Sequence, residues 1–173
     1  APNVLYLRVE SLGQKLDWLQ KRLCLDDASL KKIIIRQPTI LSCSLSTNVE
    51  PKVQWLQEQL FPAKYDDVGK LVGTHPALLG YSIETNLKPT LDFFKEYIGD
   101  EAAVELVVKA PVVLGVSLAK RLRPRLEQAQ QLGIEIDMGC LQRMAQMTEE
   151  KWLNSLDYQS EKLAKSKAEE QLW

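Results

Sequence analysis

The chain has 173 residues, of which 45% are hydrophobic and 26% are charged, as is usual for a folded protein with a buried core. No apolar run approaches the roughly 18 residues that a membrane-spanning helix needs, so membrane insertion is not expected. The net charge is −1, whereas proteins that bind nucleic acid usually carry an excess of Lys and Arg. Nucleic-acid binding would therefore depend on a local basic patch.

The first element in chain order is expected to be a truncated structural unit over residues 2–23. Its opening tetrapeptide, Pro2 to Leu5, reads Pro-x-aliphatic-Leu, a pattern that recurs three times later and predicts a short turn. A helix should follow, because leucines fall on one helical face. These leucines are Leu12, Leu16, Leu19 and Leu23.

Three later stretches, residues 38–51, 76–89 and 111–124, are copies of one another. Each starts and ends with proline, has leucine three residues after the first proline, and has serine six residues after it. The shared leucines and serines are Leu41, Leu79, Leu114, Ser44, Ser82 and Ser117. A repeat of about 35–38 residues is typical of a solenoid, whose function lies on an extended surface rather than in a catalytic pocket.

A first helix is expected ahead of each copy, over residues 26–37, 66–75 and 100–110. Each of these segments opens with an aspartate, which suits the N-cap and the positive end of the helix dipole. The aspartates are Asp26, Asp66 and Asp100. The proline that follows ends the helix, because the residue before a proline avoids helical geometry.

After the leading proline, each copy should form a short 3₁₀-like turn and then a second helix. Asn48 and Asn86 are placed to cap two of the second helices, with a proline in the first helical turn. Gly99 and Gly133 suit the left-handed position that ends such helices. The apolar stripes fall at matching offsets: Val49, Val53, Leu56 and Leu60; Leu87, Leu91, Phe94 and Ile98; Leu122, Leu126 and Leu132.

The last unit is degenerate, since Glu149 stands where its leading proline is expected while Trp152 and Leu156 keep the later offsets. We therefore expect about four helical units over residues 1–158, the first truncated and the last degenerate, and a charged C-terminal tail over residues 159–173. The predicted fold class is all-α, an α-solenoid (superhelix) of helix–helix–3₁₀ units of about 35–38 residues.

The repeat consensus, Pro-x-aliphatic-Leu-x-x-Ser followed by Leu-Lys-Pro or Leu-Arg-Pro and an aromatic-rich helix, resembles that of the mitochondrial transcription termination factor (mTERF) family. The best copy runs from His75 to Phe94, and the resemblance extends from Pro2 to about Leu156. It implies a left-handed superhelix whose concave groove binds double-stranded DNA or structured RNA in mitochondria or chloroplasts. Family members act in transcription termination, transcription regulation, intron splicing or ribosome assembly.

The densest basic cluster, residues 120–125, has four cations in six residues. It lies at the start of a second helix, where the resemblance places groove-lining residues. Its members share repeat positions with earlier cations: Lys88 with Arg123, and Lys52 with Arg125. Such cations either form a ladder that follows a phosphate backbone or belong to an ordinary solvated face. Glu50 interrupts the ladder in the first copy. The candidate nucleic-acid-binding residues are Lys52, Lys88, Lys120, Arg121, Arg123 and Arg125.

Nothing in the sequence predicts an enzyme. His75 occupies a position where the other copies have Gln37 and Ala110, so its chemistry is not demanding. The recurring serines lack the His and Asp partners of a nucleophile and are better explained as turn hydroxyls that bond nearby backbone. No glycine-rich phosphate loop or metal-ligand cluster is found, so we expect no catalytic residue, metal or cofactor.

Two functions remain open. The first is a monomeric, non-enzymatic protein that binds double-stranded nucleic acid in organellar gene expression, through backbone cations. The second is a protein-docking scaffold of an organellar complex such as a ribosome, which the near-neutral charge favours.

Overall fold

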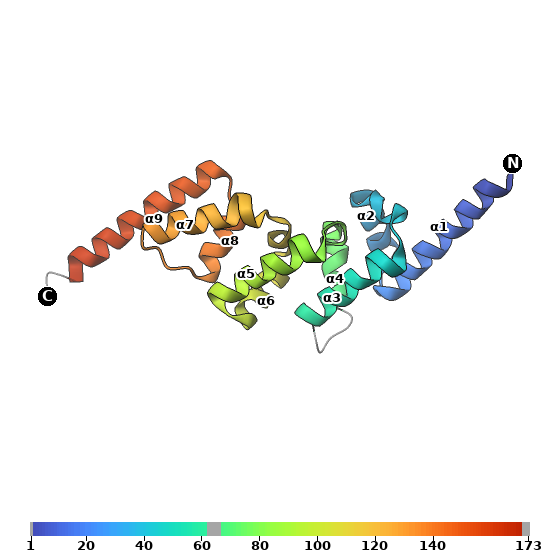
Figure 1. The fold of residues 1–173 in the computed structure, drawn as a ribbon, viewed down its shortest axis with the longest axis horizontal. Coiled ribbons are helices and arrows are strands. Elements are labelled where there is room, and N and C mark those ends of the chain that lie inside the picture. Colours follow the sequence, from blue (N-terminus) through green and yellow to red (C-terminus); the bar gives the residue numbers. More distant parts are fainter. Residues whose placement is uncertain (1, 62–66, 171–173) are drawn as a thin grey trace. The chain divides into compact units, whose positions relative to one another are not determined.

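The computed structural model describes the backbone of residues 2–61 and 67–170 and the side chains of residues 11–61, 68–165 and 167. Nine α-helices and no β-strand form in this part of the chain (Figure 1). None of the helices searched there is long and apolar enough to cross a membrane. The chain divides into two compact units, residues 1–83 (unit 1) and residues 84–173 (unit 2).

Unit 1 contains four α-helices, and two 3₁₀ turns and one π-helical turn connect them. The helices are α1 (Pro2–Arg22), α2 (Asp27–Arg36), α3 (Glu50–Leu60) and α4 (Asp67–Thr74). The 3₁₀ turns are η1 (Pro38–Ser42) and η3 (Pro76–Gly80), and the π-helical turn is η2 (Leu45–Val49).

Unit 2 contains five α-helices and repeats the same turns. The helices are α5 (Lys88–Ile98), α6 (Asp100–Lys109), α7 (Arg123–Gln131), α8 (Met138–Gln146) and α9 (Glu149–Glu170). The 3₁₀ turn is η5 (Pro111–Gly115), and the π-helical turns are η4 (Ile83–Leu87), which the unit boundary crosses, and η6 (Leu118–Leu122). The predicted all-α repeat of helix, 3₁₀ turn and helix is confirmed.

Of the three aspartates expected to cap first helices, Asp26 does so and Asp100 does not, while Asp66 lies outside the described residues. The Asp26 carboxylate accepts a hydrogen bond from the Ser29 backbone N–H at 2.8 Å, so this N-cap is confirmed. At α6 the N-cap is Gly99, with φ +82°, and the expectation for Asp100 is wrong. Gly99 is both the C-cap of α5 and the N-cap of α6, and its positive φ favours glycine.

Two of the recurring serines, Ser44 and Ser117, cap π-helical turns. Ser44 and Ser117 each accept a hydrogen bond from the backbone N–H three residues later, so their predicted role as turn hydroxyls is confirmed. Because helical geometry thus starts one turn early, Asn48 lies inside η2 and does not cap α3, contrary to expectation. Asn86 likewise lies inside η4.

Two long helices replace expected turns. Pro2 to Leu5 belongs to α1 rather than to a turn, because a proline in the first turn of a helix loses no hydrogen bond. At the other end, Glu149 replaces the proline that would start a 3₁₀ turn, and α9 runs on without a break to Glu170. The helix therefore crosses the boundary expected between the last unit and the tail.

The apolar stripes of the second helices form the cores of both units, as predicted, except at four positions: Leu12 is 40% exposed, Leu16 and Ile98 are half-buried, and Leu132 is exposed. In unit 1 they pack with Ile33, and in unit 2 with Leu141 and Trp152, all fully buried. Leu132, expected in the stripe, is 44% exposed. It follows the last residue of α7, and the chain turns at Gly133 (φ +67°), so that Ile134 is buried instead.

Candidate nucleic-acid interface

Four of the six candidate cations are exposed, and all four lie in unit 2. They lie where two second helices begin. Lys88 is the first residue of α5, Lys120 and Arg121 lie in η6, and Arg123 is the first residue of α7. We call Lys88, Lys120, Arg121 and Arg123 the outward cations.

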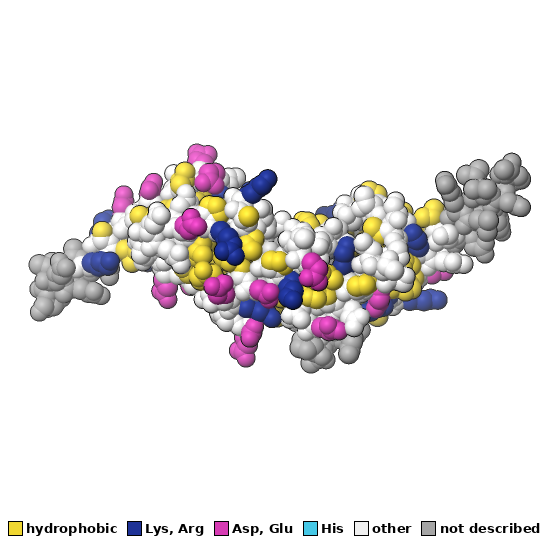
Figure 2. All heavy atoms as spheres, viewed as in Figure 1, with side chains coloured by type: hydrophobic (Ala, Val, Ile, Leu, Met, Phe, Trp, Pro, Cys, Tyr) yellow, Lys and Arg dark blue, Asp and Glu magenta, His cyan; other side chains and the backbone are white. Residues whose placement is uncertain are grey.

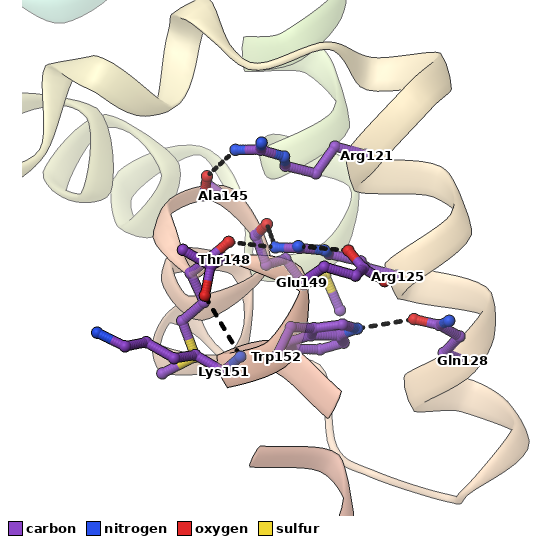
Figure 3. Close-up of polar contacts among 10 residues, drawn as sticks. Arg121, Arg125, Gln128, Ala145, Thr148, Glu149, Lys151 and Trp152 are labelled. Atoms are coloured by element: carbon purple, nitrogen blue, oxygen red, sulfur yellow. Dashed lines mark hydrogen bonds and ion pairs between the residues drawn. The ribbon is translucent and has the colours of Figure 1, made fainter. Parts of the chain in front are cut away.

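Three of the outward cations make no contact that would explain them structurally. The side chains of Lys88, Lys120 and Arg123 form no hydrogen bond or ion pair with the residues that the structure describes. Arg121 donates one long hydrogen bond, from Nη1 to the Ala145 carbonyl oxygen at 3.3 Å (Figure 3).

Lys88 and Arg123 lie inside continuous helical structure rather than at a free helix N-terminus. Each is followed by a proline, and the residue before each, Leu87 or Leu122, already has helical geometry. At the start of α7 the Arg123 N–H donates to the Leu118 carbonyl oxygen of η6, so it is not open to an anion. The case for phosphate contact at these positions therefore depends on the charges of the exposed side chains.

Arg125 is buried and does not face solvent. It is 3% exposed, and its Nη1 donates to the carbonyl oxygens of Met144 and Met147, each at 2.8 Å. Its Nη2 pairs with the Glu149 carboxylate at 2.7 Å, and the guanidinium lies 5.6 Å from the ring centre of Trp152 (Figure 3). Arg125 therefore joins α7 to the end of α8 and the start of α9, where a cation complements the helix C-terminus.

Lys52 is placed in the same way in unit 1. It is 9% exposed, and its Nζ donates to the Leu79 carbonyl oxygen of η3 and to Asn48 Oδ1, both at 2.8 Å. Lys15, at the equivalent position of α1, donates to the Leu41 and Cys43 carbonyl oxygens at 2.7 and 3.0 Å. We call Lys15, Lys52 and Arg125 the inward cations, since each ties a second helix to the backbone of the following repeat.

The inward cations revise the predicted phosphate ladder, because Lys52 and Arg125 are not available to a ligand. The sequence held a signal that would have found them. Lys52 lies three residues after Val49 and four before Leu56, and Arg125 has the same spacing from Leu122 and Ala129. Each therefore falls on the buried face of its helix. In α5 this position is Thr90, which is 1% exposed.

Glu50, which interrupts the ladder of outward positions, is held in a bidentate ion pair. Arg22 donates to its carboxylate from Nε and from Nη2, both at 2.9 Å. This pair ties α1 to the start of α3. The residue before the second proline of each copy is therefore acidic and held in an ion pair in unit 1 (Glu50), but basic and exposed in unit 2 (Lys88 and Arg123). We call this residue the outward position of the repeat.

Trp152 is a core residue and not a base-stacking surface. It is fully buried, and its Nε1 donates to Gln128 Oε1 at 2.7 Å (Figure 3). On the face that Figure 2 shows, acidic and basic side chains alternate over each unit without a continuous basic stripe. The described residues also hold no cluster of three His, Cys, Asp or Glu that could bind a metal.

Comparison with known proteins agrees with the architecture of the repeats. A search of curated proteins finds no match to the chain. The sequence model of the mTERF family matches residues 1–153, which include all of the repeated turns and all of the inward and outward cations. With that match over most of its length, and with the proline-led 3₁₀ turn repeated in its structure, the chain belongs to the mTERF family.

Proposed function

We propose that this protein binds double-stranded nucleic acid without catalysing a reaction and so regulates gene expression in mitochondria or chloroplasts. Family membership supports the coarser part of this proposal, since mTERF proteins are associated with nucleic acid and with organellar gene expression. The observation that carries the finer part is the set of outward cations, which are exposed where the π-helical turns of unit 2 lead into α5 and α7.

In this proposal Lys88, Lys120, Arg121 and Arg123 contact the phosphate backbone. Such contacts provide affinity and orientation but carry no sequence information. Specificity would then come from the shape of the duplex or from additional residues. The inward cations have no part in binding, and their role is to hold successive repeats together.

The test compares the wild-type chain with the variant Lys88→Glu/Lys120→Glu/Arg123→Glu for binding to a labelled duplex of DNA or RNA. These three side chains make no bond within the described structure, so their replacement should leave the fold intact. Each reversal removes a phosphate contact and adds repulsion, so we expect affinity to fall by more than about 100-fold at low salt. Fluorescence anisotropy measures the affinity, and circular dichroism checks the helix content.

The matched control reverses three exposed lysines of α9 in the same unit, Lys151, Lys162 and Lys165, and so makes the same change in net charge. The proposal requires this control to bind much as the wild type does. An equal loss of affinity in both variants would show that only overall charge matters, and undiminished binding by the first variant would exclude the outward cations as the interface.

One observation favours the alternative, a protein-docking scaffold. Ile35 of α2 is 68% exposed, and with Leu30 and Ile34 it lines an apolar hollow of about 330 Å³ that Asp27 and Lys31 border. An apolar surface with a charged rim is typical of a protein interface. Absence of duplex binding at low salt, together with an organellar protein that co-purifies with the wild type but not with Ile35→Ser, would favour this function instead.

A further inference from the structure

A second basic feature lies in unit 1, where a cavity of about 570 Å³ opens between α2 and α4. Lys32 of α2 and Lys70 of α4 both line it, and both lysines are exposed. The volume is within the range of about 300–1,000 Å³ that is usual for ligand sites, and it exceeds what a single small ion needs.

The two lysines occupy one repeat position. Lys32 lies six residues before Pro38, and Lys70 lies six residues before Pro76, so the repeat places one cation on each side of the cavity. The equivalent residue in unit 2 is Glu105, which forms an ion pair with Lys109. The paired lysines are thus particular to unit 1, where the outward position of the second helix is acidic.

Glycines form the α4 wall of the cavity. A Cβ atom on Gly69 would lie 1.9 Å from the Leu23 carbonyl oxygen, so α4 packs directly against the backbone that leads into α2. Gly73 lines the cavity one turn later, where a Cβ would make only ordinary contacts. The two glycines therefore let α4 lie close to the residues that lead into α2, and this close packing fixes the positions of the two helices that carry the lysines.

Further positive charge lies beside the cavity. Arg36, one turn after Lys32, donates from Nη1 to the carbonyl oxygen of Thr74, a lining residue, at 3.2 Å. Burial lowers the pKa of the adjacent His75, and the charges of Arg36 and Lys32 lower it further. One carboxylate, Asp26, also lines the cavity, but it accepts the Ser29 N–H as a helix cap. The cations outnumber this acid, so the cavity favours an anion.

We propose that the cavity between α2 and α4 binds a phosphate group, held between the ammonium groups of Lys32 and Lys70. Two lysines on opposite helices act as point charges on one tetrahedral anion, and the remaining volume accommodates the sugar to which the phosphate is attached. The phosphate belongs either to a nucleic-acid backbone or to a free phosphate or mononucleotide. The site is separate from the outward cations and does not depend on the function proposed for them.

The first experiment titrates the wild-type chain with inorganic phosphate and follows the ring resonances of His75 by NMR. The chain has a single histidine, so the signal is unambiguous. A bound anion offsets the charge of Lys32, and this should raise the pKa of His75 and shift its resonances to saturation. The variant Lys32→Gln/Lys70→Gln should lose the saturable shift. The control Lys31→Gln/Lys21→Gln, with the same charge change at exposed lysines that do not line the cavity, should keep it.

The second experiment measures duplex binding by the same variants and separates the two sources of phosphate. If the backbone is the ligand, Lys32→Gln/Lys70→Gln lowers the slope of log affinity against log salt by about 1, for one phosphate contact. If inorganic phosphate binds but duplex affinity is unchanged, the site takes free phosphate or a mononucleotide. A wild-type chain without a saturable shift, or a shift that survives in Lys32→Gln/Lys70→Gln, overturns the proposal. The phosphate titration gives its answer even if the chain binds no duplex, so failure of one proposal is distinct from failure of the other.

Discussion

At the scale of single residues, the structure separates cations of the same repeat that look alike in sequence. Arg125 donates to two backbone carbonyls and to Glu149, and it is buried against Trp152. Replacement by methionine keeps most of the packing volume but leaves the carbonyls of Met144 and Met147 without their donor. We expect Arg125→Met to lower the free energy of unfolding by about 2–4 kcal/mol, the range for unsatisfied buried polar groups. Urea denaturation followed by circular dichroism measures the change.

Two further variants test whether the loss of stability in Arg125→Met comes from its buried hydrogen bonds. Arg121→Met removes a side chain that is exposed and makes one hydrogen bond, at 3.3 Å, so it should change stability by less than about 0.5 kcal/mol. Arg125→Lys keeps the charge that Lys52 supplies at the equivalent position, and it should recover part of the loss. Equal effects of Arg121→Met and Arg125→Met would contradict the distinction between outward and inward cations.

At the scale of secondary-structure elements, α4 offers a test of how closely unit 1 is packed. Alanine at Gly69 would place its Cβ 1.9 Å from the Leu23 carbonyl oxygen, a backbone atom, so α4 would have to move. We expect Gly69→Ala to destabilise the protein by about 1–3 kcal/mol, despite the better helix propensity of alanine. Gly73→Ala, one turn later, adds only contacts of 3.8 Å or more to Leu25 and Ser29, and should stabilise by up to about 1 kcal/mol. Thermal unfolding of both variants measures the sign of each effect, and a loss of stability in Gly73→Ala as large as that in Gly69→Ala would refute the account.

The elements also show what the sequence can and cannot predict. The proline-led turns and the left-handed glycines were predictable, because Pro and Gly act through local backbone geometry. The Asp26 cap of a first helix was predictable too, but the caps of the second helices were not, since Ser44 competes with Asn48 for the same turn and both are good capping residues. The lengths of α1 and α9 were not predicted, because in neither helix does a proline enforce the expected turn. Pro2 does not interrupt a helix that starts at that residue, and Glu149 has replaced the proline that would have started a 3₁₀ turn.

At the candidate interface, helical spacing alone could separate Lys52 and Arg125 from the exposed cations. The cavity between α2 and α4 required coordinates, because Gly69 and Lys70 meet α2 only through tertiary packing.

At the scale of the whole molecule, the net charge of −1 means that no general attraction draws the chain to nucleic acid. Affinity must then come from local phosphate contacts, and the number of contacts sets the salt dependence at about 0.9 per contact. For the four outward cations we expect log affinity to fall with log salt at a slope of about −4, or about −5 if the cavity of unit 1 also holds a backbone phosphate. Anisotropy titrations of a random duplex between about 50 and 200 mM salt measure the slope.

The same titrations with Lys88→Glu/Lys120→Glu/Arg123→Glu should give a slope nearer −1, because about three contacts are lost. The α9 control variant should keep the wild-type slope, since its lysines are not among the proposed contacts. Slope is more informative here than affinity, because a partly unfolded variant loses affinity without a defined change in the number of ions released. Measurable binding with a slope near zero would mean that phosphates are not the main contact, and the apolar surface around Ile35 would then be the better place to look for the interface.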